Sequence, residues 1–168
     1  LEKLMRKYKS EFVNQKNPNI KLFITDIDGT LTDGGMYYSE NGDELKKFNT
    51  YDSAGVLFAH HLGIPVGILT GETTNIVKRR ADKLKIDYLY LGCKDKEATV
   101  TDLCSQLGIT MDEVAYIGDD VNCIEILSAV GMAACPADAD ARVKAIPGMH
   151  VMTKNGGDGC VREFCEFI

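Results

Sequence analysis

The stretch Lys21-Leu22-Phe23-Ile24-Thr25-Asp26-Ile27-Asp28-Gly29-Thr30 (KLFITDIDGT) decides the fold of this 168-residue chain. Its first half is a short apolar run, which is typical of a buried β-strand. Two carboxylates, Asp26 and Asp28, follow at once, and Gly29 lets the backbone turn away. Neighbouring carboxylates repel each other unless a cation lies between them, and oxygen-only ligands suit Mg²⁺. The segment predicts a strand that ends in a magnesium-binding pair, although a surface turn or a calcium loop has a similar pattern.

Outward from this stretch, short apolar runs alternate with amphipathic stretches. Further strands are expected at residues 64–70, 88–91, 114–117 and 132–134. Helices are expected at residues 53–62, 73–84 and 94–107, after residue 117 to about residue 129, at 138–145, and in the tail to residue 168. This alternation predicts an α/β fold with a Rossmann-like, doubly wound and mainly parallel sheet, whose sites lie at the carboxyl ends of the strands.

Residues 36–48 contain Asn41-Gly42, a strong hairpin signal, and predict a β-hairpin insertion. Residues 1–19 are polar and lysine-rich, and we interpret them as an N-terminal linker or extension. Residues 20–168 are then expected to form one domain.

The composition excludes several classes of protein. The formal net charge is -6, so nucleic acid is not expected as a partner. Apolar runs are too short to cross a membrane, so no membrane partner is expected. The six cysteines show no CxxC spacing, which argues against a zinc site. They are interpreted as reduced thiols of a cytoplasmic protein.

Three further strand ends carry polar side chains. Thr70-Gly71-Glu72 offers a hydroxyl and backbone N–H groups to a phosphate, although Thr70 or Thr73 is equally suited to cap the next helix. Lys94 and Lys96 open a helix, and Lys96 is favoured as the phosphate-binding cation because it stands in the first turn. Gly118-Asp119-Asp120 supplies another carboxylate, and Asp120 is also suited to cap a helix.

This order of elements resembles the haloacid dehalogenase superfamily of phosphatases over residues 21–168. In detail the chain resembles the subfamily of 3-deoxy-D-manno-octulosonate (KDO) 8-phosphate phosphatases. That subfamily also includes 2-keto-3-deoxynonulosonate (KDN) 9-phosphate phosphatases and the C-terminal domain of some acylneuraminate cytidylyltransferases. The similar residues are DGTLTDG at 28–34, Phe48 with Asp52 and Gly55, GDD at 118–120, PADA at 136–139, and GGDGCVRE at 156–163.

The resemblance implies a chemical role for each strand end. Asp26 is expected to attack phosphorus and form an aspartyl-phosphate, while Asp28 protonates the leaving sugar oxygen and then activates water. Mg²⁺ is expected to bind Asp26, the backbone carbonyl of Asp28, and Asp119. Thr70 and Lys96 are expected to hold the phosphoryl oxygens.

The resemblance also implies an assembly. Members of the family lack a separate cap domain and form homotetramers, in which the hairpin and the tail at residues 156–162 help to enclose a neighbour's site. Substrate contacts are further expected from Thr50, Asp52 and Arg162.

The expected substrate is a sugar-acid phosphate. Glu72 in Thr70-Gly71-Glu72 and Lys83 resemble the KDN 9-phosphate branch, because the KDO 8-phosphate branch tends to carry Arg after Thr-Gly. KDN 9-phosphate is therefore the first expectation and KDO 8-phosphate the alternative. Alternatively, Glu72 and Lys83 form only an exposed pair of side chains on a helix and have no role in substrate binding.

One position departs from the pattern and keeps another class of function open. Relatives often carry Asp where Cys123 stands, so Cys123 bears on metal affinity or rate. Together with the start at Leu1, it leaves open a weakly active or non-catalytic oligomerisation domain of an acylneuraminate cytidylyltransferase. A third possibility is a two-component receiver domain, and the Asp26-Ile27-Asp28 spacing argues against it.

Overall fold

The structure is a computed structural model that describes residues 3, 17, 19–42 and 44–168. The predicted linker at residues 1–19 falls mostly outside the described residues. Across this described part, no helix is both long and apolar enough to cross a lipid bilayer.

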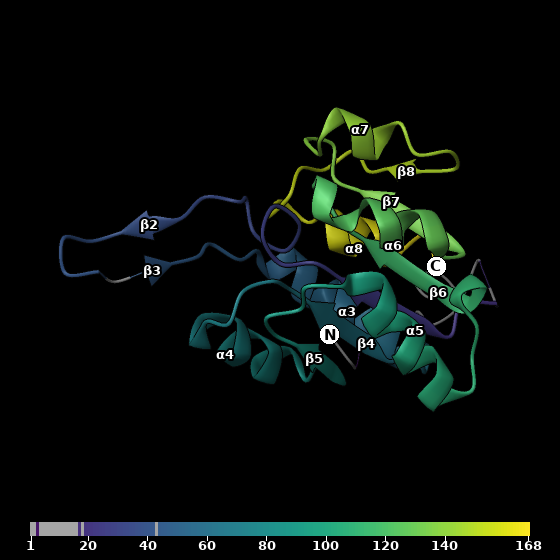
Figure 1. Ribbon diagram of the computed structural model, residues 1–168. Coiled ribbons are helices and arrows are strands. Elements are labelled where there is room, and N and C mark those ends of the chain that lie inside the picture. Colours follow the sequence, from purple (N-terminus) through teal and green to yellow (C-terminus); the bar gives the residue numbers. More distant parts are fainter. Residues whose placement is uncertain (1–2, 4–16, 18, 43) are drawn as a thin grey trace.

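A six-stranded parallel sheet forms the centre of the molecule (Figure 1). Across the sheet the strands are β5 (Tyr88–Tyr90), β4 (Val66–Leu69), β1 (Leu22–Thr25), β6 (Val114–Ile117), β7 (Met132–Cys135) and β8 (His150–Val151). Strands β1, β4, β6 and β7 are buried along their whole length. Parallel strands covered on both faces carry continuous apolar runs, which is why they were readable in the sequence.

The chain winds outward from β1 in both directions. It first passes to β4 and β5 on one side, then returns to β6 on the other side of β1 and continues to β7 and β8. Thr25 at the end of β1 is in register with Ile117 at the end of β6. The strand order therefore reverses between β1 and β6, and a doubly wound sheet binds its ligands at such a switch point.

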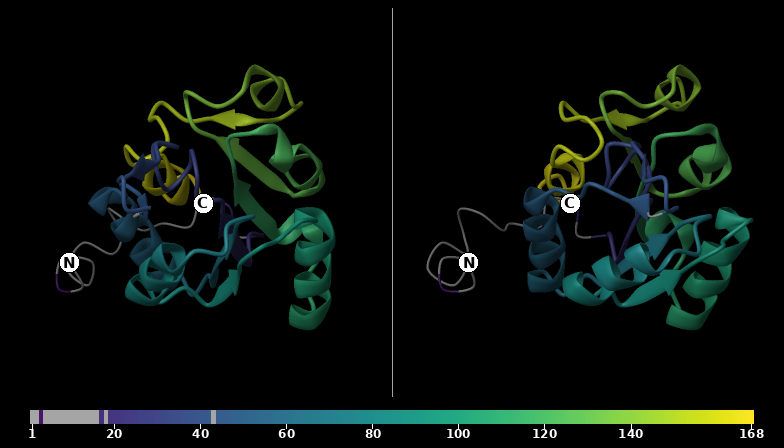
Figure 2. Two further views of the ribbon diagram at one scale, coloured as in Figure 1. Left: turned by 60° about the vertical axis from the view of Figure 1, so that its left-hand side comes forward. Right: turned by 90° about the vertical axis from the view of Figure 1, so that its left-hand side faces the viewer.

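Helices cover both faces of the sheet, giving three layers (Figure 2). One face packs against α3 (Thr50–His61), α4 (Asn75–Leu84) and α8 (Cys160–Cys165). The other packs against α5 (Lys96–Leu107), α6 (Ile124–Ala129) and α7 (Ala141–Lys144). Two short 3-10 turns, η1 (Met111–Glu113) and η2 (Val121–Cys123), flank β6.

A hairpin projects from this body (Figure 1). Its strands β2 (Tyr37–Tyr38) and β3 (Glu44–Leu45) pair antiparallel in a sheet of their own. An antiparallel bridge between Thr32 and Phe48 closes its base. Tyr38 and Leu45 are each 65% exposed, so the hairpin presents apolar side chains to solvent.

The predicted fold class is confirmed: the sheet is doubly wound and parallel, a hairpin is inserted, and the described residues contain no separate cap domain. Strand β8 was missed, because two residues give no readable alternation. Helix α7 is shorter than predicted because Asp140 caps it, its carboxylate accepting the N–H of Arg142 at 2.8 Å. All six cysteines are in the described part, and each is a free thiol as expected.

Candidate active site

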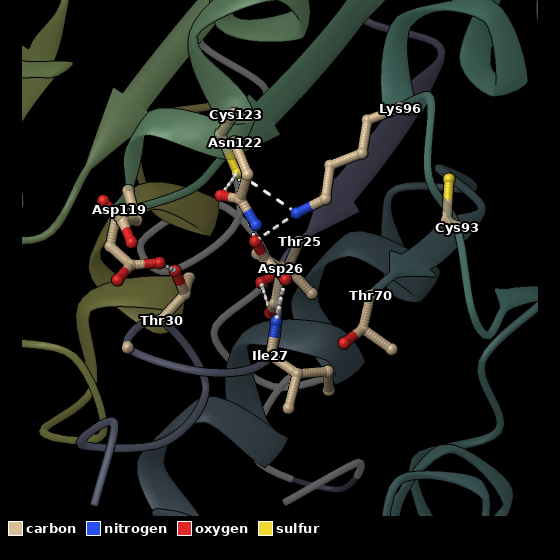
Figure 3. Close-up of polar contacts among 12 residues, drawn as sticks. Thr25, Asp26, Ile27, Thr30, Thr70, Cys93, Lys96, Asp119, Asn122 and Cys123 are labelled. Carbon is tan, nitrogen blue, oxygen red and sulfur yellow. Dashed lines mark hydrogen bonds and ion pairs between the residues drawn. The ribbon is translucent and has the colours of Figure 1, made fainter. Parts of the chain in front are cut away.

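Asp26 lies directly after β1, with 5% of its surface exposed. Its Oδ1 accepts the N–H of Ile27 at 2.7 Å. Its Oδ2 accepts hydrogen bonds from the ammonium of Lys96 and, at 3.1 Å, from the thiol of Cys123 (Figure 3). Three donors thus fix the orientation of this carboxylate.

Lys96 is the first residue of α5 and is buried. Although burial lowers its pKa, the charge of Asp26 and its hydrogen bond outweigh that effect and raise the pKa above the ordinary value. The residue is therefore a fixed cation beside the carboxylate. Its neighbour Asp95 caps the helix by accepting the N–H of Ala98 at 2.8 Å. Lys94 is exposed, so the structure places Lys96, the favoured candidate, in the site.

Cys123 is fully buried between these two charges. Burial and the charge of Asp26 raise the pKa of its thiol to about 12. The side chain is consequently a neutral thiol, which donates to Asp26 and accepts from Lys96 at 3.2 Å. The residue that departs from the expected pattern is in direct contact with the predicted nucleophile.

Asp119 follows β6 and faces Asp26 across the switch point (Figure 3). Its Oδ1 accepts the hydroxyl of Thr30 at 3.1 Å. Burial and the charge of Asp26 raise the pKa of Asp119 to about 7. Gly29 leaves room for this carboxylate, because a Cβ there would lie 1.9 Å from Asp119 Oδ2.

Above these groups is a pocket of about 320 Å³. It is lined by Asp26, Asp28, Gly29, Gly34, Thr70, Gly71, Glu72, Asp119, Asp120 and Asn122. Half of these residues carry carboxylates, so an anionic substrate needs a cation to enter.

Thr70 follows β4 and is buried at the pocket wall. Its hydroxyl accepts the N–H of Glu72 at 3.1 Å. Helix α4 begins only at Asn75, with Thr74 as its N-cap residue and no side-chain cap. The helix-cap interpretation of Thr70 and Thr73 was therefore wrong.

Comparison with known proteins identifies the family of the chain. The sequence pattern of haloacid dehalogenase-like hydrolases matches residues 91–164. The 3-deoxy-D-manno-octulosonate 8-phosphate phosphatase KdsC of Haemophilus influenzae is 38% identical over 156 residues, which cover 93% of this chain and 86% of that protein. The chain belongs to the haloacid dehalogenase superfamily. Within it, the chain falls in the subfamily of the KDO 8-phosphate phosphatases, and it is a phosphoric monoester hydrolase.

Solved structures of the superfamily agree with this placement. The phosphatase from Moraxella catarrhalis, crystallised with magnesium, phosphate and KDO, has a TM-score of 0.85 and 33% identity and covers 98% of this chain and 90% of that one. The cobalt-bound enzyme from Haemophilus influenzae has a TM-score of 0.82 and 39% identity, with 89% and 86% covered.

The donors in this haloacid dehalogenase site fit a divalent cation. Asp26 and Asp119 offer carboxylate oxygens. Burial and, after it, the charge of Asp26 raise the pKa of Asp119, and a cation would offset this repulsion. The described residues contain no cluster of three or more His, Cys, Asp or Glu side chains suited to a metal. Two carboxylates suffice for a hard ion that keeps several waters.

Five residues predicted to bind substrate do not line the pocket of this superfamily member: Thr50, Asp52, Lys83, Lys96 and Arg162. Of these, Lys96 contacts Asp26, which does line the pocket. Thr50 and Lys83 are exposed on the first turn of α3 and the last turn of α4. Lys83 stands on α4, whereas Glu72 precedes that helix and lines the pocket, so the two are not an exposed helix pair.

Asp52 is fully buried, which speaks against the expected substrate contact within one chain. Its Oδ1 accepts the N–H of Arg162 at 3.1 Å and so ties α8 to α3. The guanidinium of Arg162 bonds Glu166 at 2.8 Å and lies over the rings of Tyr51 and Phe58. Both residues join helices in this chain instead of reaching the pocket.

The glycine-rich tail at residues 156–159 packs against the turn at residues 28–33, which follows Asp26. The N–H of Gly157 donates to the carbonyl of Thr30 at 3.0 Å, and the side-chain amide of Asn49 donates to the carbonyl of Gly157 at 2.9 Å. A Cβ at Gly156 would lie 1.9 Å from the carbonyl oxygen of Gly29. Only glycine fits here, and the tail therefore supports the turn that carries the aspartates.

Besides Asn122, which lines the pocket, the sequence analysis missed Lys46. It follows β3, and its ammonium lies 2.6 Å from Asp28 Oδ1 and 3.5 Å from Glu44 Oε1. Burial lowers its pKa, but the hydrogen bond to Asp28 and the charges of Asp28, Glu72 and Glu44 raise it overall. No pattern marks one lysine after a hairpin, because only the folding-back of the strand brings it to the site.

Proposed function

We propose that the chain hydrolyses the phosphate monoester of a sugar acid, with KDO 8-phosphate as the best supported substrate. The observation that carries the proposal is the position of Asp26. It lies at the switch point of the sheet, with Lys96 on one side and Asp119 on the other. A held carboxylate beside a fixed cation and a metal-binding partner is suited to phosphoryl transfer.

In this proposal a carboxylate oxygen of Asp26 attacks phosphorus, and the bond from phosphorus to the sugar oxygen breaks. Asp28 donates a proton to the departing oxygen. In the second step Asp28 takes a proton from the water that hydrolyses the aspartyl-phosphate, which restores Asp26. The hydroxyl of Thr70 and the ammonium of Lys96 bind the phosphoryl oxygens.

Mg²⁺ is the proposed cofactor. Asp26, Asp119 and the backbone carbonyl of Asp28 are the proposed ligands, and Thr30 orients Asp119 through its 3.1 Å hydrogen bond. When bound, the ion supplies positive charge between the carboxylate and the phosphoryl group. Its binding would also remove the repulsion between Asp26 and Asp119.

The choice of sugar acid rests on two observations that point in different directions. The KdsC relative, which covers 93% of the chain, is named for KDO 8-phosphate. Glu72 favours KDN 9-phosphate as a second candidate, because it lines the pocket beside Thr70 and Gly71 and can accept bonds from sugar hydroxyls. Lys83, the other half of that argument, does not line this pocket. KDO 8-phosphate is therefore the better supported of the two.

Phosphate release with Mg²⁺ from KDO 8-phosphate, KDN 9-phosphate and p-nitrophenyl phosphate tests the proposal. We expect the sugar-acid phosphates to be preferred and Asp26→Asn to lose about 10⁴-fold in kcat. Asp102→Asn, an exposed Asp on α5, is the matched control and should keep full activity. Substantial turnover by Asp26→Asn would refute the mechanism. Glu72→Arg should lower the use of KDN 9-phosphate relative to KDO 8-phosphate, and an unchanged ratio would remove the second candidate.

We further propose that the enzyme works as a homotetramer. The projecting hairpin exposes Met36, Tyr37, Tyr38 and Leu45, which are 41–65% exposed in the single chain. Exposed apolar side chains gathered on one projection are typical of a protein interface. Light scattering should give four times the mass of one chain, and a monomer at working concentration would contradict this.

A further inference from the structure

Lys46 occupies an unusual place for a lysine. It stands on the returning arm of the hairpin, yet no part of its side chain is exposed. Lysine side chains are rarely buried unless they are paired. The pairing here is with Asp28 Oδ1 at 2.6 Å, and Glu44 lies further away at 3.5 Å. The hairpin therefore places the buried ammonium of Lys46 beside Asp28, the proposed general acid and base.

The Asp28 carboxylate depends on this contact more than Asp26 depends on any one partner. Asp26 is held by Ile27, Lys96 and Cys123. Within the described part of the chain, no side chain or backbone N–H other than Lys46 donates a hydrogen bond to the Asp28 carboxylate. The Asp28 side chain is 35% exposed, so the surrounding packing leaves it room to turn. Its direction is set by the lysine.

The arm that carries the lysine is itself anchored to the turn at residues 28–33. Thr32 bridges Phe48 at the base of the hairpin. On the other side of Lys46, Leu45 pairs with Tyr37 in the hairpin. These contacts on either side of Lys46 keep its backbone in place. The lysine is thus a fixed donor and not a solvent-exposed side chain in passing contact.

We infer that Lys46 is a positioning residue that orients Asp28 for proton transfer to the leaving oxygen. The inference rests on the proposed function. Because Lys46 donates to Oδ1, Oδ2 remains for the proton that is transferred. The O–H bond of Asp28 breaks, an O–H bond to the departing sugar oxygen forms, and Lys46 keeps its own protons.

Two substrates with different leaving groups test this role in the Lys46→Met variant. KDO 8-phosphate releases an alkoxide that needs a proton, whereas p-nitrophenyl phosphate releases a phenolate that is stable without one. A misplaced acid should cut kcat for KDO 8-phosphate by about 10²-fold and leave its KM within about threefold. For p-nitrophenyl phosphate, kcat should stay within about threefold.

Control variants separate positioning from structural damage. Lys47→Met removes the neighbouring, largely exposed lysine and should change neither substrate. Lys46→Arg keeps a charged donor and should recover part of the activity. In an Asp28→Asn background, Lys46→Met should cause little further loss, because both changes remove the same step.

Three outcomes would each overturn the inference. They are an equal loss of kcat on both substrates, a wild-type kcat for Lys46→Met, and losses of kcat in the double variant that equal the product of the two single losses. Those outcomes leave the proposed function intact as long as the wild type is active. Failure of the wild type to release phosphate from either substrate would instead overturn the proposed function, and the inference with it. Circular dichroism melts of all variants identify any loss caused by unfolding.

Discussion

Replacing Asp52 with Asn should remove a defined part of the pH dependence of stability. Asp52 is fully buried in the first turn of α3. Its Oδ1 accepts the N–H of Arg162, while its Oδ2 has no hydrogen-bond partner. Burial raises its pKa from 3.8 to about 6, although the N–H groups of Arg162 and Val161 act in the opposite direction.

The sign and size of the effect follow from this shift. A carboxyl whose pKa is higher in the folded chain binds its proton more tightly there, so its contribution to stability is greatest below pH 3.8 and is lost as the pH rises through about 6. Each pKa unit corresponds to about 1.4 kcal/mol. Between pH 5 and pH 8 the loss assigned to Asp52 is about 1 kcal/mol, and the full loss from more acidic conditions is about 3 kcal/mol.

Urea unfolding of the wild type and of Asp52→Asn at several pH values, with a chelator present, measures this loss. Asn cannot titrate, so the difference between the two free energies of unfolding should change by about 1 kcal/mol from pH 5 to pH 8. The exposed control Asp102→Asn should run parallel to the wild type. A difference that stays constant across this pH range would refute the assignment. A large rise in KM without any change in stability would instead restore the predicted substrate contact.

The contacts predict the outcome of three further substitutions. Cys123→Asp adds a carboxylate beside Asp26, so calorimetry should show Mg²⁺ bound about tenfold more tightly; unchanged affinity would mean that Cys123 does not tune the site. Thr30→Val removes the donor to Asp119 and should weaken Mg²⁺ binding by about tenfold in the same assay; tighter binding would contradict that contact. Gly156→Ala places a Cβ 1.9 Å from the carbonyl oxygen of Gly29 and should lower the free energy of unfolding by about 1–3 kcal/mol, and a wild-type melt would show that the tail can move aside.

The fold was predictable because buried parallel strands are short continuous apolar runs, and those around Phe23, Ile68 and Tyr116 are of this kind. The chemistry at the strand ends was predictable for a related reason. Carboxyl ends of parallel strands meet at one edge of the sheet, so Asp26 and Asp119 could be brought together without knowing any distance.

The supporting residues were not predictable in this way. Lys46 reaches Asp28 because a hairpin folds back, and Asp52 is buried because α8 packs on α3. Arg80 is half-buried, donates to the carbonyl of Asn49 at 3.0 Å and lies over the ring of Phe48. Each position depends on a contact between distant segments, which neither periodicity nor local spacing encodes.

The central place of β1 also governs when the site can exist during synthesis. Leu22 pairs with Val114, so the strand that carries Asp26 cannot complete its pairing until β6 has been synthesised. Such distant pairing is slow to form. Asp26 and Asp119 meet only after β1 and β6 have paired, and a cation that requires both therefore stabilises the finished sheet and not its precursors. A nascent chain that lacks β6 has the predicted nucleophile but not the partner carboxylate, and it should neither retain the ion nor cleave phosphate esters.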